Sequence, residues 1–599
     1  MPKVKELRLM ADKLRIHSLK STSAAGSGHP TTCLSCAEIM SCLFFSVLKE
    51  DDEFILSKGH AAPILWAVYA EAGFIPRDEL LNLRKFNSVL EGHPTPRMSM
   101  VKIATGSLGQ GLSAGVGMAL AKKLDKNPGI IYVLLGDGET AEGAVWEAAS
   151  LASHYKLNNL CAVVDVNRLG QSQQTIHGHD LIAYKNKFEA FGWNSIIING
   201  HNVRKVLGAL RKARKSKKPC VILAKTIKGK GVSFLEGKEG WHGRALDENE
   251  LRRALHEFKY WPEYKKVTLK SNIKEKKVKY EFYDFVTNKY ALDEMTATRT
   301  AFGKALVSFG KNNSKVVVLD GDVKNSTMTK YFFKKFPDRS FECFIAEQNM
   351  VGAAMGLSAL GFVPFVSTFG AFLTRAYDFI RMAHYSDSNI NFIGSHAGVS
   401  IGQDGPSQMG LEDLSMFLAM PNSAVIYPCD AVSTEKLIRE MGKHKGISYM
   451  RTTREKTPVI YEHTEDFQIG GLKVLRKSNS DKALVIGAGI TVHEALKAHD
   501  LLIRKGINIR VIDLYSVKPI DEPELVKHAK QCRNNVIVVE DHYANGIGPV
   551  VSQVLGKTKH LYIKENLYIK EIPRSGKPEE LRAKYRINAD AIVKAVEKK

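Results

Sequence analysis

An aspartate between two glycines follows a short apolar run near position 135. Gly136-Asp137-Gly138 comes directly after IIYVLL, and Asn167 comes directly after a second run, LCAVVDV. Ligand sites in parallel sheets form at the carboxyl ends of strands, where glycines let backbone N–H groups approach a phosphate. The Asp137 carboxylate, the Asn167 amide and the Leu169 carbonyl offer the oxygens that Mg²⁺ prefers. The spacing predicts a magnesium ion bound with a diphosphate; the alternative, a plain turn, is weakened by Asn167.

Four histidines stand beside glycines: His29, His60, His93 and His242. Imidazoles placed in this way can bind hydroxyls or phosphate, or move protons. Metal ligation is the competing interpretation, and it requires the rings to converge at ligand distance. Glu347 follows a strand-like run and begins a helical pattern, for which ordinary capping is the alternative to a chemical role.

Short β-rich apolar runs separated by helical patterns must position these side chains. They lie at 130–135, 160–166, 220–226, 315–320, 363–368, 390–395, 423–428, 483–489, 508–514 and 535–541. Near-continuous apolar strands with helices between them predict parallel sheets covered on both faces, so we expect an α/β fold throughout. A lysine-rich stretch without clean periodicity predicts a linker over 261–295, and a weaker boundary falls near 456–482. Three α/β domains are therefore expected, over 1–260, 296–460 and 475–599.

The composition limits the classes of function. The 599 residues include 86 Lys and Arg against 63 Asp and Glu, for a net charge of +23. Such a charge attracts anions, but the lysine clusters at 204–218 and 264–279 carry few aromatic residues and no nucleic-acid module. A solvated surface and a charged linker are favoured over a nucleic-acid site. We see no apolar run of transmembrane length and no apolar signal core, so a soluble intracellular protein is expected.

The eight cysteines are scattered, and Cys33 and Cys36 form the one close pair. A C-x-x-C spacing can mark zinc or redox chemistry, but no second Cys or His pair stands nearby at zinc-ligand spacing. The surrounding small residues indicate a packed helix. We therefore expect buried, inert thiols, and reduced cysteines agree with a cytosolic setting.

Taken together, these segments resemble the transketolase family, in its animal-type subgroup, over essentially the whole chain. The matching stretches are AAGSGHPT, LSKGHAAPILWAV, ATGSLGQG, LLGDGETAEG, VNRLGQS, KTIKGKG, IAEQNM, STFGAFLTRA, GSHAGVSIGQDGPSQM, RTTR and IPRSGKP. The resemblance implies a pyrophosphate-binding domain over 1–260, a pyrimidine-binding domain over 296–460 and a transketolase C-terminal domain over 475–599. It also implies a cytoplasmic homodimer with active sites across the interface.

The resemblance also assigns roles to individual residues. Thiamine diphosphate is implied, with Mg²⁺ held by Asp137, Asn167 and Leu169; Ca²⁺ or Mn²⁺ can substitute. The implied cofactor-binding residues are Thr32, His60, Gly106, Ser107, Leu108, Gly138, Asn167, Lys228, His242, Phe369, Phe372 and Gln408. The implied substrate-binding residues are His29, His93, His242, Arg299, Ser326, His396, Asp404 and Arg454. Glu347, His29 and His242 are the implied catalytic residues, with Glu347 sharing a proton with the aminopyrimidine ring of the cofactor.

The implied reaction is the reversible transfer of a glycolaldehyde unit by a thiamine diphosphate ylid, a step of the non-oxidative pentose phosphate pathway. The donors are ketose phosphates (xylulose 5-phosphate, sedoheptulose 7-phosphate), and the acceptors are aldose phosphates (ribose 5-phosphate, erythrose 4-phosphate, glyceraldehyde 3-phosphate). Arginine suits phosphate recognition because its planar fork pairs with two oxygens at once. The arginine set therefore favours phosphorylated acceptors and disfavours dihydroxyacetone synthase, and the motifs match deoxyxylulose-phosphate synthase less well.

Some features depart from the family pattern. The stretch around 46–58 is shorter than usual by about one surface loop, but Lys58 and His60 remain. Gln408 stands where the microbial and plant subgroup has a histidine, and that subgroup has a third aromatic residue near Arg375. Two alternatives stay open: a catalytically weak transketolase-like scaffold, and a secondary nucleic-acid-binding role resting on the net charge.

Overall fold

A computed structural model of the chain describes residues 2–258, 266–275, 278 and 280–598. Residues 261–265, 276, 277 and 279 of the predicted linker, and residues 259 and 260 before it, lie outside the described residues. The chain divides into two compact units. Unit 1 comprises Met1–Lys279, Val351–Leu360 and Tyr385–Asp387, and unit 2 comprises Tyr280–Met350, Gly361–His384 and Ser388–Lys599.

Unit 1 contains a five-stranded sheet in which every neighbouring pair is parallel, in the order β1-β2-β3-β5-β4. Its strands are β1 (Glu53–Leu56), β2 (Ile131–Gly136), β3 (Leu160–Val166), β4 (Asn194–Asn199) and β5 (Cys220–Lys225). Every residue of β2 and β3 is buried. Strands covered on both faces are apolar along their whole length, which explains why these two runs stand out in the sequence.

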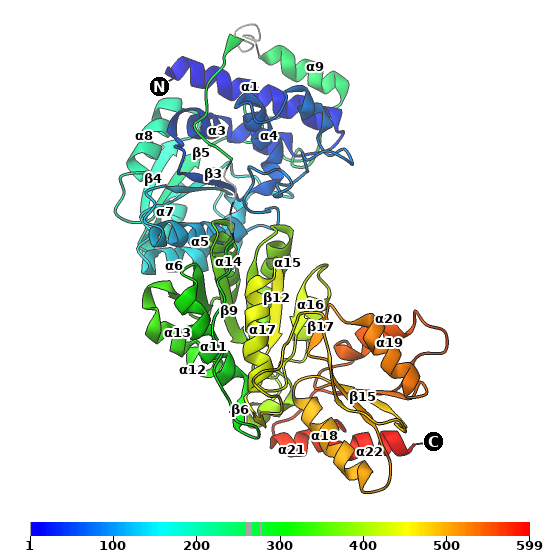
Figure 1. Cartoon of the computed structure of the whole chain (residues 1–599). Helices are drawn as coiled ribbons and strands as arrows, with labels where there is room; N and C mark the ends of the chain where they lie inside the picture. The colour runs from blue at the N-terminus through cyan, green and yellow to red at the C-terminus, as the bar shows by residue number, and fades with distance from the viewer. Residues whose placement is uncertain (1, 259–265, 276–277, 279, 599) are drawn as a thin grey trace. The chain divides into compact units, whose positions relative to one another are not determined.

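The unit 1 helices are α1 (Val4–Ala24), α2 (Pro30–Ser35), α3 (Ala37–Cys42), α4 (Ala62–Glu71), α5 (Gln110–Leu124), α6 (Gly143–His154), α7 (Leu181–Ala190), α8 (Val203–Ala213) and α9 (Glu248–Glu257). Short helical turns occur at η1 (Leu43–Val47), η2 (Gly59–Ala61), η3 (Asp78–Asn82) and η4 (Gly138–Ala141). The helices lie on both sides of the sheet (Figure 1). Tyr132 and Leu134 share a core cluster with Leu14 of α1. On the opposite face α5 lies so close that a Cβ on Gly115 would stand 2.7 Å from Val133 Cγ2.

Helix α8 carries the first lysine-rich cluster. Val203, Val206 and Leu210 are buried at the spacing of one helical face, while the basic side chains around them are exposed. The exposed basic residues are Arg204, Lys205, Arg211, Lys212, Lys215, Lys217 and Lys218. This arrangement matches the solvated surface expected from the sequence.

Unit 2 contains two larger sheets. The first has the order β17-β11-β12-β10-β9-β7-β8, the second has the order β14-β16-β15-β18-β19, and β13 and β6 form a separate pair. The strands are β6 (Met295–Ala297), β7 (Val316–Asp320), β8 (Ser340–Glu342), β9 (Val363–Phe369), β10 (Ile390–Ser395), β11 (Ala424–Ile426), β12 (Ile447–Arg451), β13 (Lys456–Pro458), β14 (Lys473–Arg476), β15 (Leu484–Gly487), β16 (Arg510–Asp513), β17 (Ser516–Lys518), β18 (Val536–Val539) and β19 (Ile563–Leu567). Antiparallel pairing is confined to β11–β17, β13–β6 and β14–β16 among the described strands.

The helices after residue 297 are α11 (Thr298–Asn312), α12 (Lys324–Thr327), α13 (Lys330–Lys335), α14 (Glu347–Ala359), α15 (Tyr377–Tyr385), α16 (Asp413–Leu418), α17 (Ala431–Lys443), α18 (Ile490–Ile503), α19 (Glu522–Gln531), α20 (Ile547–Leu555), α21 (Pro578–Lys584) and α22 (Ala589–Glu597). Short turns occur at η5 (Pro337–Arg339), η6 (Phe372–Ala376) and η7 (Val399–Asp404). Two core clusters fill unit 2. One joins α11 and α17 to the seven-stranded sheet, and the other packs α18 and α22 against β15, β16 and β18.

The ten apolar runs singled out in the sequence all contain strands, and most of the pairing is parallel. The predicted α/β class is therefore confirmed. The boundaries of the three expected domains stay predictions. Among the residues described, no helix is both long and apolar enough to cross a membrane.

Candidate functional site

The carboxyl ends of four parallel strands deliver side chains to one pocket of unit 1. Lys58 follows β1, Asp137 follows β2, Asn167 follows β3 and Lys228 follows β5, and all four line the pocket. The pocket brings together twelve residues predicted from the sequence: His29, Thr32, His60, His93, Gly106, Leu108, Asp137, Gly138, Asn167, Leu169, Lys228 and His242. Ser107 lies between two of these residues in the chain. The common edge of the strands explains why positions more than 200 residues apart, such as His29 and His242, meet here.

Backbone N–H groups just after β3 donate hydrogen bonds to both Asp137 and Asn167. Asp137 Oδ2 accepts hydrogen bonds from the Arg168 N–H, at 2.6 Å, and from the Thr175 hydroxyl, at 3.2 Å. Asn167 Oδ1 accepts one from the Leu169 N–H at 3.2 Å. Arg168 has a φ of 67°, in the left-handed region, which turns the chain sharply after β3. A carboxylate oxygen and an amide oxygen thus lie on one wall of the pocket.

The four histidines of the sequence pattern form a cluster. The ring centroid of His29 lies 5.4 Å from that of His60, 6.2 Å from that of His93 and 5.3 Å from that of His242. His60 and His242 are stacked at 5.2 Å. Among the residues described, no group of three or more His, Cys, Asp or Glu side chains is arranged to hold a metal ion. The rings therefore converge without forming the metal centre that the sequence left open.

Lys228 connects the loop after β3 to this cluster. Its ammonium group donates to the carbonyl oxygens of Leu169, at 2.8 Å, and Gly170, at 3.0 Å, and it contacts His242 Nδ1 at 2.6 Å. His242 Nδ1 also lies 3.1 Å from the Gly170 carbonyl oxygen, so Nδ1 accepts in the contact with Lys228 in one tautomer and donates to Gly170 in the other. His29 Nδ1 is buried without a hydrogen-bond partner among the described residues.

The electrostatics of the pocket favour an anion. Burial, together with Arg84, His93 and Lys228, lowers the pKa of His29 to about 4. Burial and Lys228 lower the pKa of His242 to about 4, and burial and Lys58 lower that of His60 well below its usual value. Burial also lowers the pKa of Lys228 to about 8. The three histidines are therefore neutral at pH 7. Lys228 is a buried cation whose ammonium group contacts two carbonyl oxygens and His242, so a bound diphosphate would add negative charge beside it.

The residues that the sequence missed lie behind the pocket lining. Glu139 is buried and accepts from the Gly109 N–H at 2.9 Å, from the Gly136 N–H at 3.0 Å and from the Ser57 hydroxyl. It therefore ties the loop at 106–109 to the strand end that carries Asp137. Lys58, Glu139, Gly170 and Gln171 also line the pocket without having been predicted to do so. For Glu139, the available signal in the sequence was a charged residue close to a fully buried strand, because a buried charge is usually paired.

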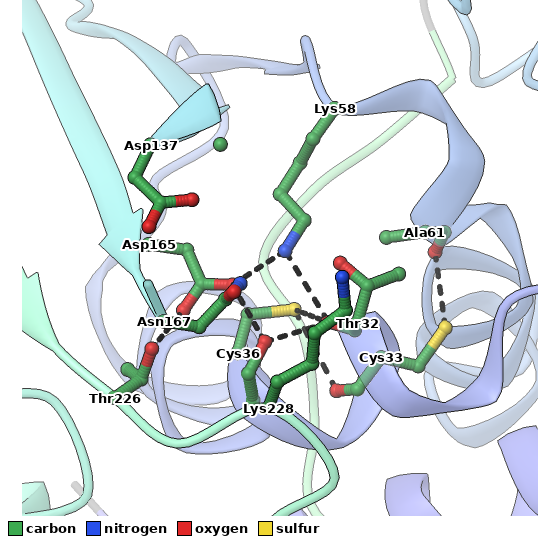
Figure 2. A network of polar contacts seen from close by, with 12 residues as sticks. Thr32, Cys33, Cys36, Lys58, Ala61, Asp137, Asp165, Asn167, Thr226 and Lys228 are labelled. Atoms are coloured by element: carbon green, nitrogen blue, oxygen red, sulfur yellow. Dashed lines mark hydrogen bonds and ion pairs between the residues drawn. The ribbon is translucent and has the colours of Figure 1, made fainter. Parts of the chain in front are cut away.

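The C-x-x-C pair lies beside this site and is inert. Cys33 and Cys36 are both buried and free, and their thiols donate to backbone carbonyl groups of Ala61 and Thr32 (Figure 2). Burial raises the pKa of Cys33 to about 12 and raises that of Cys36 further. Thiols held protonated in this way neither bind zinc nor react readily, as expected from the sequence.

Unit 2 gathers the predicted sugar-phosphate residues. Arg299 Nη1 donates to the Ser326 carbonyl at 2.9 Å and lies 3.4 Å from His396 Nε2. Arg454 Nη1 pairs with Asp404 Oδ2 at 2.9 Å, and both residues are exposed. Burial, with Arg299 and Arg454 nearby, lowers the pKa of His396 to about 3, so its ring is neutral. These five residues comprise two arginine cations, two uncharged side chains and one carboxylate, that of Asp404.

An aromatic stack and a buried carboxylate complete the predicted set in unit 2. Phe369 and Phe372 are stacked, with ring centroids 5.0 Å apart and planes inclined by 9°. Glu347, at the start of α14, is 4 % exposed, and its Oε2 lies 3.8 Å from the guanidinium of the exposed Arg375. Gln408 is partly buried in the segment after η7. Glu347 is thus a nearly buried carboxylate at a helix start, with the Arg375 guanidinium at the edge of ion-pair distance.

Comparisons with known proteins cover the whole chain. Three family models match in order: "Transketolase, thiamine diphosphate binding domain" at residues 7–292, "Transketolase, pyrimidine binding domain" at 294–459 and "Transketolase, C-terminal domain" at 472–592. Transketolase of Homo sapiens is 47% identical over 609 residues, covering 99% of this chain and 97% of the human protein. Transketolase-like protein 2 of Mus musculus is 48% identical over 606 residues, with 98% and 96% covered.

A solved structure gives the same result for the fold. The crystal structure of transketolase from Campylobacter jejuni subsp. jejuni NCTC 11168 has a TM-score of 0.87 and 26% sequence identity, with 100% of both chains covered. This chain therefore belongs to the transketolase family, the thiamine diphosphate-dependent enzymes that transfer a two-carbon unit from a ketose phosphate to an aldose phosphate.

Proposed function

We propose that the unit 1 pocket holds the diphosphate of thiamine diphosphate together with Mg²⁺, for which Ca²⁺ or Mn²⁺ can substitute. The observation that carries this proposal is the wall formed by Asp137, Asn167 and the Leu169 carbonyl, in a pocket that is also lined by Lys228. One carboxylate with an amide and a carbonyl oxygen suits Mg²⁺, which takes its remaining oxygens from phosphate and water. Lys228, now on the Leu169 carbonyl, would then turn its ammonium group toward the diphosphate.

The donor set fits the group for a second reason. Burial and the neighbouring Asp165 raise the pKa of Asp137 to about 6, so an ionised Asp137 lacks compensating positive charge. A divalent cation would supply that charge. The glycines allow close backbone approach: a Cβ on Gly106 would stand 2.8 Å from the His93 ring, so any side chain there would crowd the pocket. Thr32, His60, Ser107, Leu108 and Gly138 complete the proposed cofactor set.

Thiamine diphosphate supplies, when bound, the carbanion chemistry that breaks and forms the carbon–carbon bond. We assign Glu347 the exchange of a proton with the aminopyrimidine ring, a role that its burial supports. Phe369 is stacked with both Phe372 and His396, and Phe372 is the ring we assign to stacking on the pyrimidine. Gln408 is assigned to the same end of the cofactor.

We also assign residues of each unit, taken separately, to the substrate. In unit 2, Arg299, Arg454, Ser326 and His396 are assigned to the sugar phosphate, and Asp404 to a substrate hydroxyl. In unit 1, His29, His93 and His242 are assigned to the reacting end of the sugar. The lowered pKa values of His29 and His242 leave both rings neutral at pH 7, so either can accept a proton.

The assembly and cellular setting belong to the same proposal. We propose a homodimer with active sites across its interface, working in the non-oxidative pentose phosphate pathway of the cytoplasm. All eight cysteines are free and buried, which agrees with a reducing compartment. Sugar phosphates are the proposed small-molecule partners, and a membrane or nucleic-acid partner is not proposed.

The decisive experiment is a direct assay. The purified chain is given thiamine diphosphate, Mg²⁺, xylulose 5-phosphate and ribose 5-phosphate, and formation of glyceraldehyde 3-phosphate is followed. Turnover in the unaltered chain, with cofactor binding but little turnover in Glu347→Gln, is the expected result. Saturated cofactor without product would instead support a catalytically weak scaffold. Salt-sensitive binding of RNA or DNA at physiological ionic strength would favour the nucleic-acid alternative.

A further inference from the structure

A fully buried ion pair lies directly behind the proposed metal ligands. Lys58 Nζ donates to Asp165 Oδ2 at 2.5 Å, and both side chains are at most 1 % exposed (Figure 2). Replacing such a buried pair with apolar residues of similar volume is often neutral for stability, so stability alone does not explain its presence. Only Lys58 lines the pocket; Asp165, the sixth residue of β3, lies behind it.

Asp165 is surrounded by hydrogen-bond donors. Besides Lys58, its carboxylate accepts from the Ser35 hydroxyl at 2.6 Å, from the Thr226 hydroxyl at 2.5 Å and from Asn167 Nδ2 at 3.1 Å. Lys58 Nζ also donates to the Thr32 carbonyl at 3.3 Å, which connects the same carboxylate to α2. The pair is thus tied to three strand ends and one helix, so its position is fixed.

The contact with Asn167 determines which end of the amide faces the pocket. A carboxylate accepts and cannot donate, so the Asn167 NH₂ group must point at Asp165. Its oxygen then points away, where it accepts from the Leu169 N–H at 3.2 Å on the pocket wall. Without Asp165 the two amide orientations would be closer in energy, and one of them would present NH₂ to a cation.

We propose that Asp165, anchored by Lys58, is a positioning residue that holds the Asn167 amide with its oxygen toward the divalent cation. This inference rests on the proposed function, which places that cation on Asp137 and Asn167. Partners that orient metal ligands typically change metal affinity by about 10–100-fold when removed.

The test replaces the pair without leaving a buried charge. Lys58→Met combined with Asp165→Leu keeps the volume similar and removes the acceptor for the Asn167 NH₂ group. Mn²⁺ binding is measured by electron paramagnetic resonance at saturating thiamine diphosphate, and thermal unfolding is measured in parallel. We expect the Mn²⁺ dissociation constant to rise about 10–100-fold. Ser41→Ala, the control, removes a buried hydroxyl of unit 1 that donates to the Leu7 carbonyl at 2.8 Å and not to this carboxylate, and it should leave Mn²⁺ affinity unchanged.

A third substitution tests whether weaker Mn²⁺ binding comes from the orientation of the Asn167 amide or from a general disturbance of the structure. Asn167→Asp introduces a group whose two oxygens are equivalent, so no orientation presents a donor to the cation. In the unaltered chain it places two carboxylates side by side and should weaken Mn²⁺ binding, whereas added to Lys58→Met/Asp165→Leu it should restore binding. Asn167→Asp would thus change Mn²⁺ affinity in opposite directions in the two backgrounds. Such a result means that residue 167 and the buried pair are energetically coupled, which a merely structural role does not produce. The same sign in both backgrounds would overturn the proposal.

Two further outcomes distinguish this inference from the proposed function. If Asp137→Asn leaves Mn²⁺ affinity unchanged, the cation does not bind here and the proposed metal site fails. If Asp137→Asn weakens binding but Lys58→Met/Asp165→Leu does not, only the positioning role fails. Should the paired variant not fold, Asn167→Asp alone decides the question, because stronger or unchanged Mn²⁺ binding in that variant contradicts the proposal.

Discussion

Phe369 lies face to face with His396, with ring centroids 3.9 Å apart and planes inclined by 10°. The two residues meet because β9 and β10 are parallel neighbours: Ser395 pairs with Phe369, and His396 follows at once. His396 has a φ of 56°, an uncommon conformation for a non-glycine residue. Phe372 is stacked on Phe369 as well. Phe369 therefore supports two neighbouring rings, and Phe372 is the better placed of the two phenylalanines to meet a cofactor.

Truncating each of the two phenylalanines should show that Phe369 mainly stabilises the fold and that Phe372 mainly binds the cofactor. Phe369→Ala removes a buried ring and should lower the free energy of unfolding by about 3–5 kcal/mol. Phe372→Ala, in a partly buried ring, should cost less stability but raise the dissociation constant of thiamine diphosphate more. Urea unfolding and quenching of intrinsic fluorescence by the cofactor measure the two effects. Equal losses of cofactor affinity at equal stability would contradict the division of roles.

A buried carboxyl group in the C-terminal part of unit 2 should make stability depend on pH. Asp513, the last residue of β16, accepts from the Tyr461 hydroxyl at 2.8 Å and from the Cys429 thiol at 3.2 Å. Burial raises its pKa from 3.8 to about 7. Between these two values the folded chain binds the proton that the unfolded chain has lost. This stabilising contribution is present at low pH and disappears as the pH rises through about 7.

Asp513→Asn should remove that dependence. The amide stays neutral, so the variant should gain stability relative to the unaltered chain by about 1.4 kcal/mol per pH unit across this window. Urea midpoints of both chains at pH 4.5, 5.5, 6.5 and 7.5 provide the comparison. Asp590→Asn, at an exposed aspartate in the first turn of α22, is the control and should show no such trend. A flat difference for Asp513→Asn would show that the carboxyl group is ionised in the folded chain throughout.

The buried pair of Arg451 and Asp413 should respond very differently to single and double replacement. Arg451 Nε donates to Asp413 Oδ2 at 2.9 Å, and neither side chain is exposed. Asp413→Leu strands a buried guanidinium and should cost about 3–5 kcal/mol in the free energy of unfolding. Asp413→Leu combined with Arg451→Met removes both charges and should cost much less than the sum of the single changes. Additive losses in a urea double-mutant cycle would mean that the pair is not coupled.

Strands in the middle of the sheets were the easiest elements to predict. β2, β3 and β10 are buried on both faces, so their sequences are apolar throughout. The edge strands β4 and β19 were missed because most of their residues are only partly buried or are exposed, so each strand includes polar residues and its apolar run is at most three residues long. β1 was missed for a similar reason, since it begins with Glu53 and spans four residues.

Site residues, like strands, were predictable where the neighbouring sequence marks them and not where it does not. Asp137 and Asn167 were predictable because each directly follows a recognisable strand, and parallel strands end at a common edge. Lys58, Glu139 and Asp165 were not, because their roles depend on contacts across as many as 130 residues. For Asp165, the local signal was an aspartate inside the otherwise apolar run LCAVVDV. A buried strand tolerates such a charge only when it has a partner.

The proposed sharing of the active site between subunits can be tested by complementation. Asp137→Asn disables the proposed metal wall in unit 1, and Glu347→Gln disables the proposed proton exchange in unit 2. Each variant alone should be nearly inactive. If unit 1 of one subunit works with unit 2 of its partner, a mixed dimer has one site with both defects and one site with neither.

Co-expression with two different affinity tags produces the mixed dimers for assay. With random pairing, roughly half of the dimers are mixed and half of their sites are intact, so roughly a quarter of the unaltered activity should return. If each site is built within a single chain, every site in a mixed dimer carries one defect and activity stays at the level of the single variants. Tandem affinity purification isolates the mixed species, so a failure to exchange subunits is recognised before the activity is interpreted. Recovery at the expected level, with each tagged parent inactive, would establish both the dimer and the division of the site between its subunits.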